Sequence, residues 1–253
     1  MKKFPFTIIF ILISFLISIL ISKYNLTNYD KIVVSNGGSY HQMIKADTLR
    51  YLAHGAKIKN QLENNVDYFL TGREHFTKYL PPRIAAAYYH FFDKDLFNNF
   101  DEKKINLGVH FPYLVIQCLV YYLSLFFLYC VISKKIEKKI CLPVVMFLAL
   151  EPTIFQYHGT FWSESIFFSI QIILFALILR DKFKFYDFLV IGIFLSLLSL
   201  QRQTAYFFII PLTVYYLINL KKNEYYKLFF MFLAFMIVQS FVGFNNFSAS
   251  PLK

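Results

Sequence analysis

The sequence predicts an all-α integral membrane protein, with about seven transmembrane helices and a large helical external loop between the first and the second. Of its 253 residues, 57% are hydrophobic, and the mean hydropathy is +0.49. A soluble domain of this size could not bury so many apolar side chains. The apolar runs lack the alternation that is typical of barrel strands. Helices are therefore the structure in which the backbone N–H and C=O groups can all form hydrogen bonds within lipid.

The first apolar run covers residues 4–21 and follows Lys2 and Lys3. A signal peptide begins in a similar way, but this run is longer than a usual signal core, and no small-residue cleavage site follows it. We therefore predict an uncleaved first transmembrane helix within residues 1–22, with its N-terminus in the cytoplasm.

The polar stretch 23–110 is predicted to be the external loop, and residues 111–253 contain the further transmembrane helices. Their apolar runs lie near 111–132, 141–157, 164–179, 186–200, 205–220 and 226–243.

The connections between these runs alternate in charge. Those at 133–139, 180–184 and 221–227 are rich in lysine, whereas those at 158–164 and 201–204 are not. Alternating helices place every lysine-rich connection on the side of the N-terminus, as the positive-inside rule requires. The same bias accounts for the net charge of +11, so we do not expect nucleic acid as a partner.

A few charged residues lie where the chain meets the predicted external surface. Ionisable groups inside membrane helices are costly and often functional. Glu164 also suits the first turn of a helix capped by Ser163, and Glu151 and His158 also suit the headgroup region. Arg202 stands in "SLQRQTAYF" with no other charge nearby. Its guanidinium suits a phosphate, although a lipid headgroup would also satisfy it.

The external loop contains two segments with helical character. Apolar residues between 40 and 58 predict an amphipathic helix on the membrane surface, with Asp47 among them. Further on, Pro81 and Pro82 predict the start of a second helix rich in alanine and aromatic residues. Arg83 follows this proline pair.

Five stretches of the sequence form a pattern in their order and spacing. They are "DTLRY", "KYLPPRIAAAYYHFF", "LALEPTIF", "WSESIFF" and "IGIFLSLLSLQRQT". This pattern resembles the GT-C membrane glycosyltransferases, which move a sugar from a polyprenyl-phosphate carrier, and the chain resembles the N-terminal seven-helix module of that family. Related families are the protein mannosyltransferases, the aminoarabinose transferase of lipid A and the rhizobial lipopolysaccharide-core transferases. Glu151 and Gln203 depart from the pattern, because the family often has asparagine and proline there.

The resemblance implies a role for each candidate residue. Asp47 would be the catalytic base, and Asp30 is an alternative acid for that role. Asn36 stands at another position where the family pattern would place the catalytic acid. Arg202 would bind the donor phosphate, and Arg83 is the alternative residue for this role. Residues expected to organise the site are Glu164, His158 and Tyr51.

The expected partners are a polyprenyl-phosphate-linked sugar donor, a glycan or lipid acceptor, and membrane lipids. The family pattern requires no cofactor. Acidic residues that lie at the same depth near the external surface are nevertheless compatible with a divalent metal. The composition suggests a bacterial inner membrane, with the active site on the periplasmic side. A flippase or export component for lipid-linked saccharides, or a catalytically inactive GT-C-like subunit, are the alternatives.

Overall fold

The structure is a computed structural model that describes residues 6–27, 55, 58–59, 80–92, 111–151, 164–180 and 183–242. Every regular element in these ranges is a helix, which confirms the all-helical class. The elements are α1 (Phe6–Thr27), α4 (Leu80–Phe92), α5 (Phe111–Ile132), α6 (Lys138–Leu150), α8 (Glu164–Ile178), α9 (Phe185–Gln201), the 3-10 helix η3 (Gln203–Phe208), α10 (Ile209–Asn219), the 3-10 helix η4 (Lys222–Glu224) and α11 (Tyr226–Val242).

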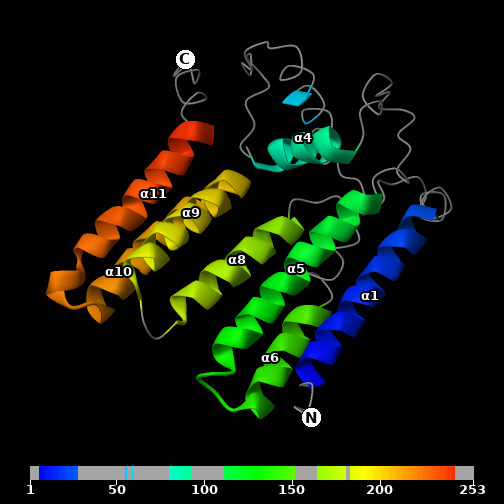
Figure 1. Cartoon of the computed structure of the whole chain (residues 1–253), viewed down its shortest axis with the longest axis horizontal. Coiled ribbons are helices and arrows are strands. Elements are labelled where there is room, and N and C mark those ends of the chain that lie inside the picture. The colour runs from blue at the N-terminus through cyan, green and yellow to red at the C-terminus, as the bar shows by residue number, and fades with distance from the viewer. Residues whose placement is uncertain are drawn as a thin grey trace.

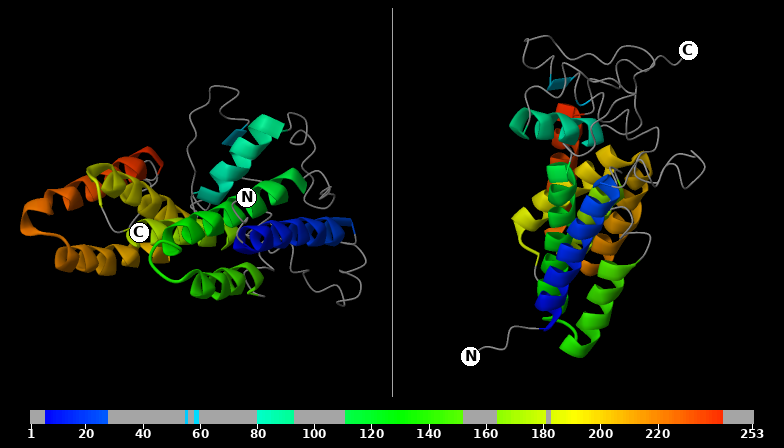
Figure 2. Two further views of the ribbon diagram at one scale, coloured as in Figure 1. Left: turned by 60° about the horizontal axis from the view of Figure 1, so that its bottom comes forward. Right: turned by 90° about the vertical axis from the view of Figure 1, so that its right-hand side faces the viewer.

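The apolar helices α1, α5, α6, α8, α9, α10 and α11 alternate in direction through one bundle (Figure 1). The lysine-rich connections lie at one end, which we call the basic end. The start of α8 and the end of α9 lie at the other, which we call the α4 end. Helix α4 lies across this second end (Figure 2), with Leu80 packed against the core and Tyr88 against Tyr113 of α5 at 5.4 Å.

Helix α6 ends earlier than the apolar run near 141–157 suggests. Its last residue is Leu150, and Glu151 has an extended ψ of 120°. Because Pro152 follows, steric clash with the proline ring disfavours helical dihedrals at Glu151. Helix α6, which forms the start of the predicted third span, therefore ends at Leu150, and Glu151 lies at the helix terminus; the rest of that apolar run lies outside the described residues.

In the part of the chain that the structure describes, two helices are long and apolar enough to cross a membrane, namely α1 through Phe6–Tyr24 and α5. The other apolar helices among the described residues are shorter. Their outward side chains are nevertheless large and apolar, as in Phe147, Phe207 and Ile218, which are 69%, 73% and 77% exposed. Such exposed side chains occur on each of the apolar helices α1, α5, α6, α8, α9, α10 and α11, and extensive exposed apolar surface is typical of a membrane or protein interaction site. Both features indicate that the protein associates with a membrane.

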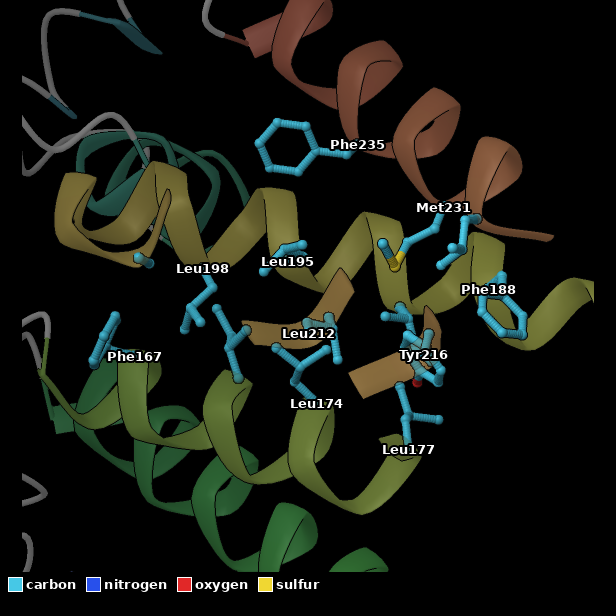
Figure 3. Packing of buried hydrophobic residues seen from close by; sticks show 14 residues of the cluster. Phe167, Leu174, Leu177, Phe188, Leu195, Leu198, Leu212, Tyr216, Met231 and Phe235 are labelled. Atoms are coloured by element: carbon cyan, nitrogen blue, oxygen red, sulfur yellow. The ribbon is translucent and has the colours of Figure 1, made fainter. Parts of the chain in front are cut away.

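Helix α8 joins two clusters of buried side chains. The first cluster connects it to α9, α10 and α11 through residues such as Leu174, Leu195 and Met231 (Figure 3). The second connects it to α1, α5 and α6, with Ile172 and Ala176 as its contributions. Because α8 is packed on both sides, the position of its first residue, Glu164, is fixed by both halves of the bundle.

The contact between α9 and α11 depends on Gly192. A Cβ atom there would lie 2.2 Å from the carbonyl oxygen of Met231 and 3.0 Å from Cβ of Ala234. The oxygen belongs to the backbone, so relief of the clash requires the two helices to separate.

We expect Gly192→Ala to destabilise the bundle, although alanine favours helix by about 1 kcal/mol. Overpacking typically costs about 1–3 kcal/mol, and Gly192→Leu should cost more. Thermal unfolding of the purified protein in detergent measures the change. Ile193→Ala is the matched control, since Ile193 is 38% exposed on the same helix. A Gly192→Ala protein as stable as the parent would contradict the close approach.

Candidate functional site

Arg202 and Glu164 form an ion pair at the α4 end, in which Nη2 of Arg202 donates a hydrogen bond to Oε1 of Glu164. Glu164 is the first residue of α8, and Arg202 is the C-cap residue of α9 with extended dihedrals (φ −146°, ψ 127°). These two packed helices run in opposite directions, so the start of one meets the end of the other. Each charge also opposes the partial charge of its own helix end, which stabilises it.

The guanidinium of Arg202 is held in place and keeps donors for a further ligand. Its carbon Cζ lies 5.3 Å from the centre of the Phe167 ring, a cation–π contact. The side chain of Glu164 is 17% exposed and that of Arg202 is 35% exposed. The buried Nε of Arg202 has no acceptor among the described residues. Because a guanidinium has five N–H donors and the side chain is partly exposed, N–H groups on its terminal nitrogens can still bind an arriving anion, whereas Nε is too buried to do so.

An apolar pocket of about 390 Å³ lies further into the bundle, and its lining includes neither Arg202 nor Glu164. Leu198 lines it and lies one turn before Arg202 on α9, roughly 6 Å along the helix axis. Gln171 of α8 also lines it, among otherwise apolar side chains from α5, α6, α8, α9 and η3. A cation at the α4 end therefore lies one helical turn from a residue that lines an apolar pocket.

The other candidate residues do not join this pair in the described structure. Arg83 lines a second pocket on α4, and Arg202 is not among the residues that line it. Asp47, Tyr51 and His158, as well as the alternatives Asp30 and Asn36, lie outside the described residues. Within the described part of the chain, no group of three or more histidine, cysteine or acidic residues could hold a metal ion.

A polar network behind Arg202 was missed by the sequence analysis. Gln239 of α11 donates from Nε2 to Oγ of Ser199 at 2.6 Å and of Ser196 at 3.1 Å. Its Oε1 accepts a hydrogen bond from the Tyr206 hydroxyl at 3.0 Å. The network therefore ties α11 to the residues on both sides of Arg202. A signal was present, because serines within an apolar run require hydrogen-bond partners.

We expect Gln239→Leu to lower the stability of the bundle by about 0.6–1.7 kcal/mol, the range for interhelical hydrogen bonds in membrane proteins. The loss should loosen the turn that holds Arg202. Thermal unfolding in detergent checks the first effect. Ser240→Ala is the control, because Ser240 is exposed and its hydroxyl bonds only to Ile237 of its own helix among the described residues. Equal effects of both substitutions would contradict the role of the network.

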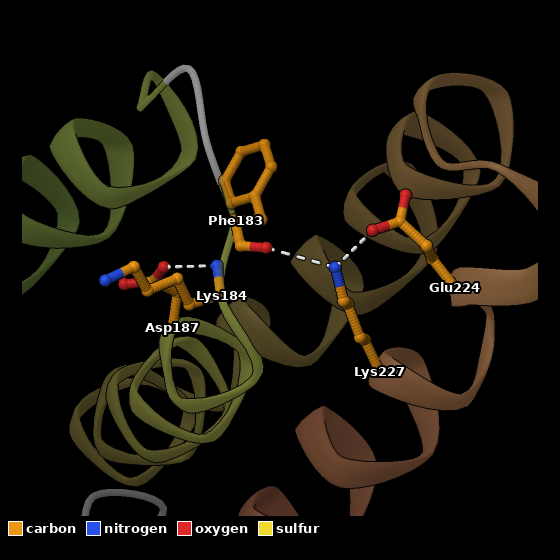
Figure 4. Close-up of polar contacts among 5 residues, drawn as sticks. All are labelled: Phe183, Lys184, Asp187, Glu224 and Lys227. Carbon is orange, nitrogen blue, oxygen red and sulfur yellow. Dashed lines mark hydrogen bonds and ion pairs between the residues drawn. The ribbon is translucent and has the colours of Figure 1, made fainter.

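A second charged cluster lies at the basic end (Figure 4). Asp187 is buried and accepts hydrogen bonds from Nη1 of Arg180 at 2.6 Å and the backbone N–H of Lys184 at 2.7 Å. Lys227 donates to the carbonyl oxygen of Phe183 at 3.0 Å and to Glu224. The hydrogen bond from Lys227 lowers the pKa of Glu224. These charges pair with one another, so we interpret the cluster as structural. It holds the connection before α9 against the connection before α11.

No family model, curated protein or solved structure matches this chain. The chemistry of the site is therefore inferred from its own residues and from the stretches that resemble the GT-C enzymes.

Proposed function

We propose that the protein is a membrane glycosyltransferase of the GT-C type. It moves a sugar from a polyprenyl-phosphate carrier to a hydroxyl group of a cell-surface glycan or lipid. The observation that supports this function best is the position of Arg202, which Glu164 and Phe167 orient at the α4 end, one helical turn from Leu198 in the lining of the apolar pocket. A polyprenyl-phosphate sugar combines an anion with a long apolar chain. The guanidinium suits its phosphate, and the pocket suits part of its chain.

The proposal places all the apolar helices across a bacterial inner membrane. The basic end faces the cytoplasm, because cytoplasmic loops carry an excess of lysine and arginine. The α4 end, with Arg202 and Glu164, then faces the periplasm. A polyprenyl-linked donor and a cell-surface acceptor meet at this surface.

In the proposed reaction, the acceptor hydroxyl attacks the anomeric carbon of the donor sugar. The bond from this carbon to the phosphate oxygen breaks, and polyprenyl phosphate leaves. Asp47 takes the hydroxyl proton as general base, in the role that the resemblance gives it. Arg202 stabilises the negative charge that grows on the leaving phosphate. Glu164 positions the guanidinium and does not touch the reacting atoms.

A transfer assay tests the proposal and separates it from its alternatives. The full chain is reconstituted in liposomes with undecaprenyl-phosphate glucose, galactose or mannose, each labelled in the sugar, and with glycan extracted from bacterial envelopes. A transferase moves label into the glycan and releases undecaprenyl phosphate. A flippase moves the intact donor between leaflets, and an inactive subunit does neither. Donor that remains intact in every mixture would overturn the transferase function.

A further inference from the structure

Cations outnumber acids among the described residues of the basic end. The connections that follow α5, α8 and α10 all lie there (Figure 1). Each acid described at this end already forms an ion pair with a cation. The pairs are Glu137 with Lys139, Asp187 with Arg180, and Glu224 with Lys227. Further lysines on the same connections therefore keep this end positive.

Three of these lysines, one on each connection, are exposed. They are Lys134 after α5, Lys184 before α9, and Lys222 at the start of η4. Within the described part of the chain, none of the three forms an ion pair. Their ammonium groups therefore attract an anion from outside the chain. Because they stand on three separate connections along one end of the bundle, they suit an extended anionic surface better than a small molecule.

Exposed tyrosines stand beside two of these lysines. Tyr186, Tyr225 and Tyr226 are 50%, 36% and 54% exposed, and each lies within four residues of Lys184 or Lys222. The ammonium nitrogen of Lys184 lies 5.6 Å from the centre of the Tyr186 ring. Tyrosine is enriched where the lipid headgroups meet the hydrocarbon core. This position of the tyrosines indicates that the lysines lie at the level of the headgroups.

The order of side chains at the start of α11 matches the profile of a bilayer. Lys222 precedes the helix, Tyr226 begins it, and Phe229, about one turn further on, is 62% exposed. A charge is thus followed by an amphipathic ring and then by an apolar ring. Nucleic acid and small anions would also attract the lysine, but neither would cover the exposed phenylalanine. A membrane with anionic headgroups satisfies all three side chains.

We propose that the basic end binds the phosphate groups of anionic lipids, such as phosphatidylglycerol, through Lys134, Lys184 and Lys222. The paired charges of Arg180 and Lys227 hold the connections in place and do not contact the lipid. The proposal rests on the association of the protein with a membrane and not on the glycosyltransferase function. Near an anionic membrane surface, each lysine should contribute roughly fivefold in affinity.

Native mass spectrometry of the full chain in detergent provides the test, with phosphatidylglycerol and phosphatidylcholine of the same acyl chains titrated separately. We expect phosphatidylglycerol to bind more tightly. The triple variant Lys134→Gln, Lys184→Gln, Lys222→Gln should bind it up to roughly a hundredfold more weakly, and its affinity for phosphatidylcholine should not change. The triple variant Lys134→Arg, Lys184→Arg, Lys222→Arg should keep the preference, because it keeps the charge.

The single variant Lys23→Gln is the control for net charge. Lys23 is exposed near the C-terminal end of α1, and its replacement removes the same charge as Lys222→Gln. Only Lys222→Gln should weaken phosphatidylglycerol. Equal losses in the two variants would mean that net charge alone decides, and would overturn the proposal.

Three other results would also overturn it. Equal affinity of the parent chain for both lipids would remove the anionic preference. An unchanged preference in the triple glutamine variant would place the lipid elsewhere. Displacement of phosphatidylglycerol by an equal concentration of inorganic phosphate would show a site for free anions instead of lipid. Circular dichroism and gel filtration establish that each variant is folded.

Discussion

Replacing Arg202 with alanine should lower sugar transfer about 10²–10³-fold, the usual effect of removing one group that stabilises transition-state charge. The guanidinium is fixed by Glu164 and by the Phe167 ring, so it is oriented before the donor arrives. The charge on the phosphate grows as the bond to the sugar breaks. Both kcat and kcat/KM should therefore fall, because the lost interaction is strongest in the transition state.

Arg202→Lys should retain part of the activity, since an ammonium keeps the charge and loses the planar fork. The control is Arg180→Ala, which also removes an arginine from an ion pair with an acid, Asp187, at the opposite end of the bundle. Both alanine variants leave a carboxylate without its arginine. Per folded molecule, Arg180→Ala should transfer sugar normally. Equal activity of Arg202→Ala and the parent would remove the phosphate role.

The positions of the helices could be predicted because apolar runs and lysine-rich connections determine them locally. The run near 111–132 coincides with α5, and the run near 226–243 coincides with α11 within one residue. The end of α6 could have been placed correctly too, since the rule for residues that precede proline applies directly to Glu151.

Contacts between distant segments could be predicted only in part. Alternating helices put Glu164 and Arg202 at the same level, but their pairing depends on α8 and α9 being packed neighbours. The hydrogen bonds of Gln239 depend on which faces of α9 and α11 pack against each other. Arg83 was grouped with Arg202 because both are arginines expected at one surface. In the structure Arg83 lines a pocket on α4, and Arg202 is not among the described residues that line it.

Replacing Asp47 with asparagine should lower sugar transfer about 10²–10⁴-fold, the typical contribution of a general base. Asparagine has nearly the shape of aspartate but cannot take the proton of the acceptor hydroxyl. The variant should still insert into the membrane and bind donor, because the changed group acts on the acceptor. The transfer assay measures the first effect, and titration with undecaprenyl-phosphate glucose measures the second.

Asp30→Asn is the matched control, since Asp30 is another acid in the same polar stretch, residues 23–110. If Asp47 is the base, Asp30→Asn keeps the parent activity, whereas an inactive Asp30→Asn with an active Asp47→Asn would transfer the role to Asp30.

The double variant Asp47→Asn, Arg202→Ala adds a further test. Groups that act as one catalytic unit are strongly non-additive, so the double variant should lose much less than the product of the single losses. A fully multiplicative loss would mean that the two residues act independently, and would contradict a single displacement assisted by both.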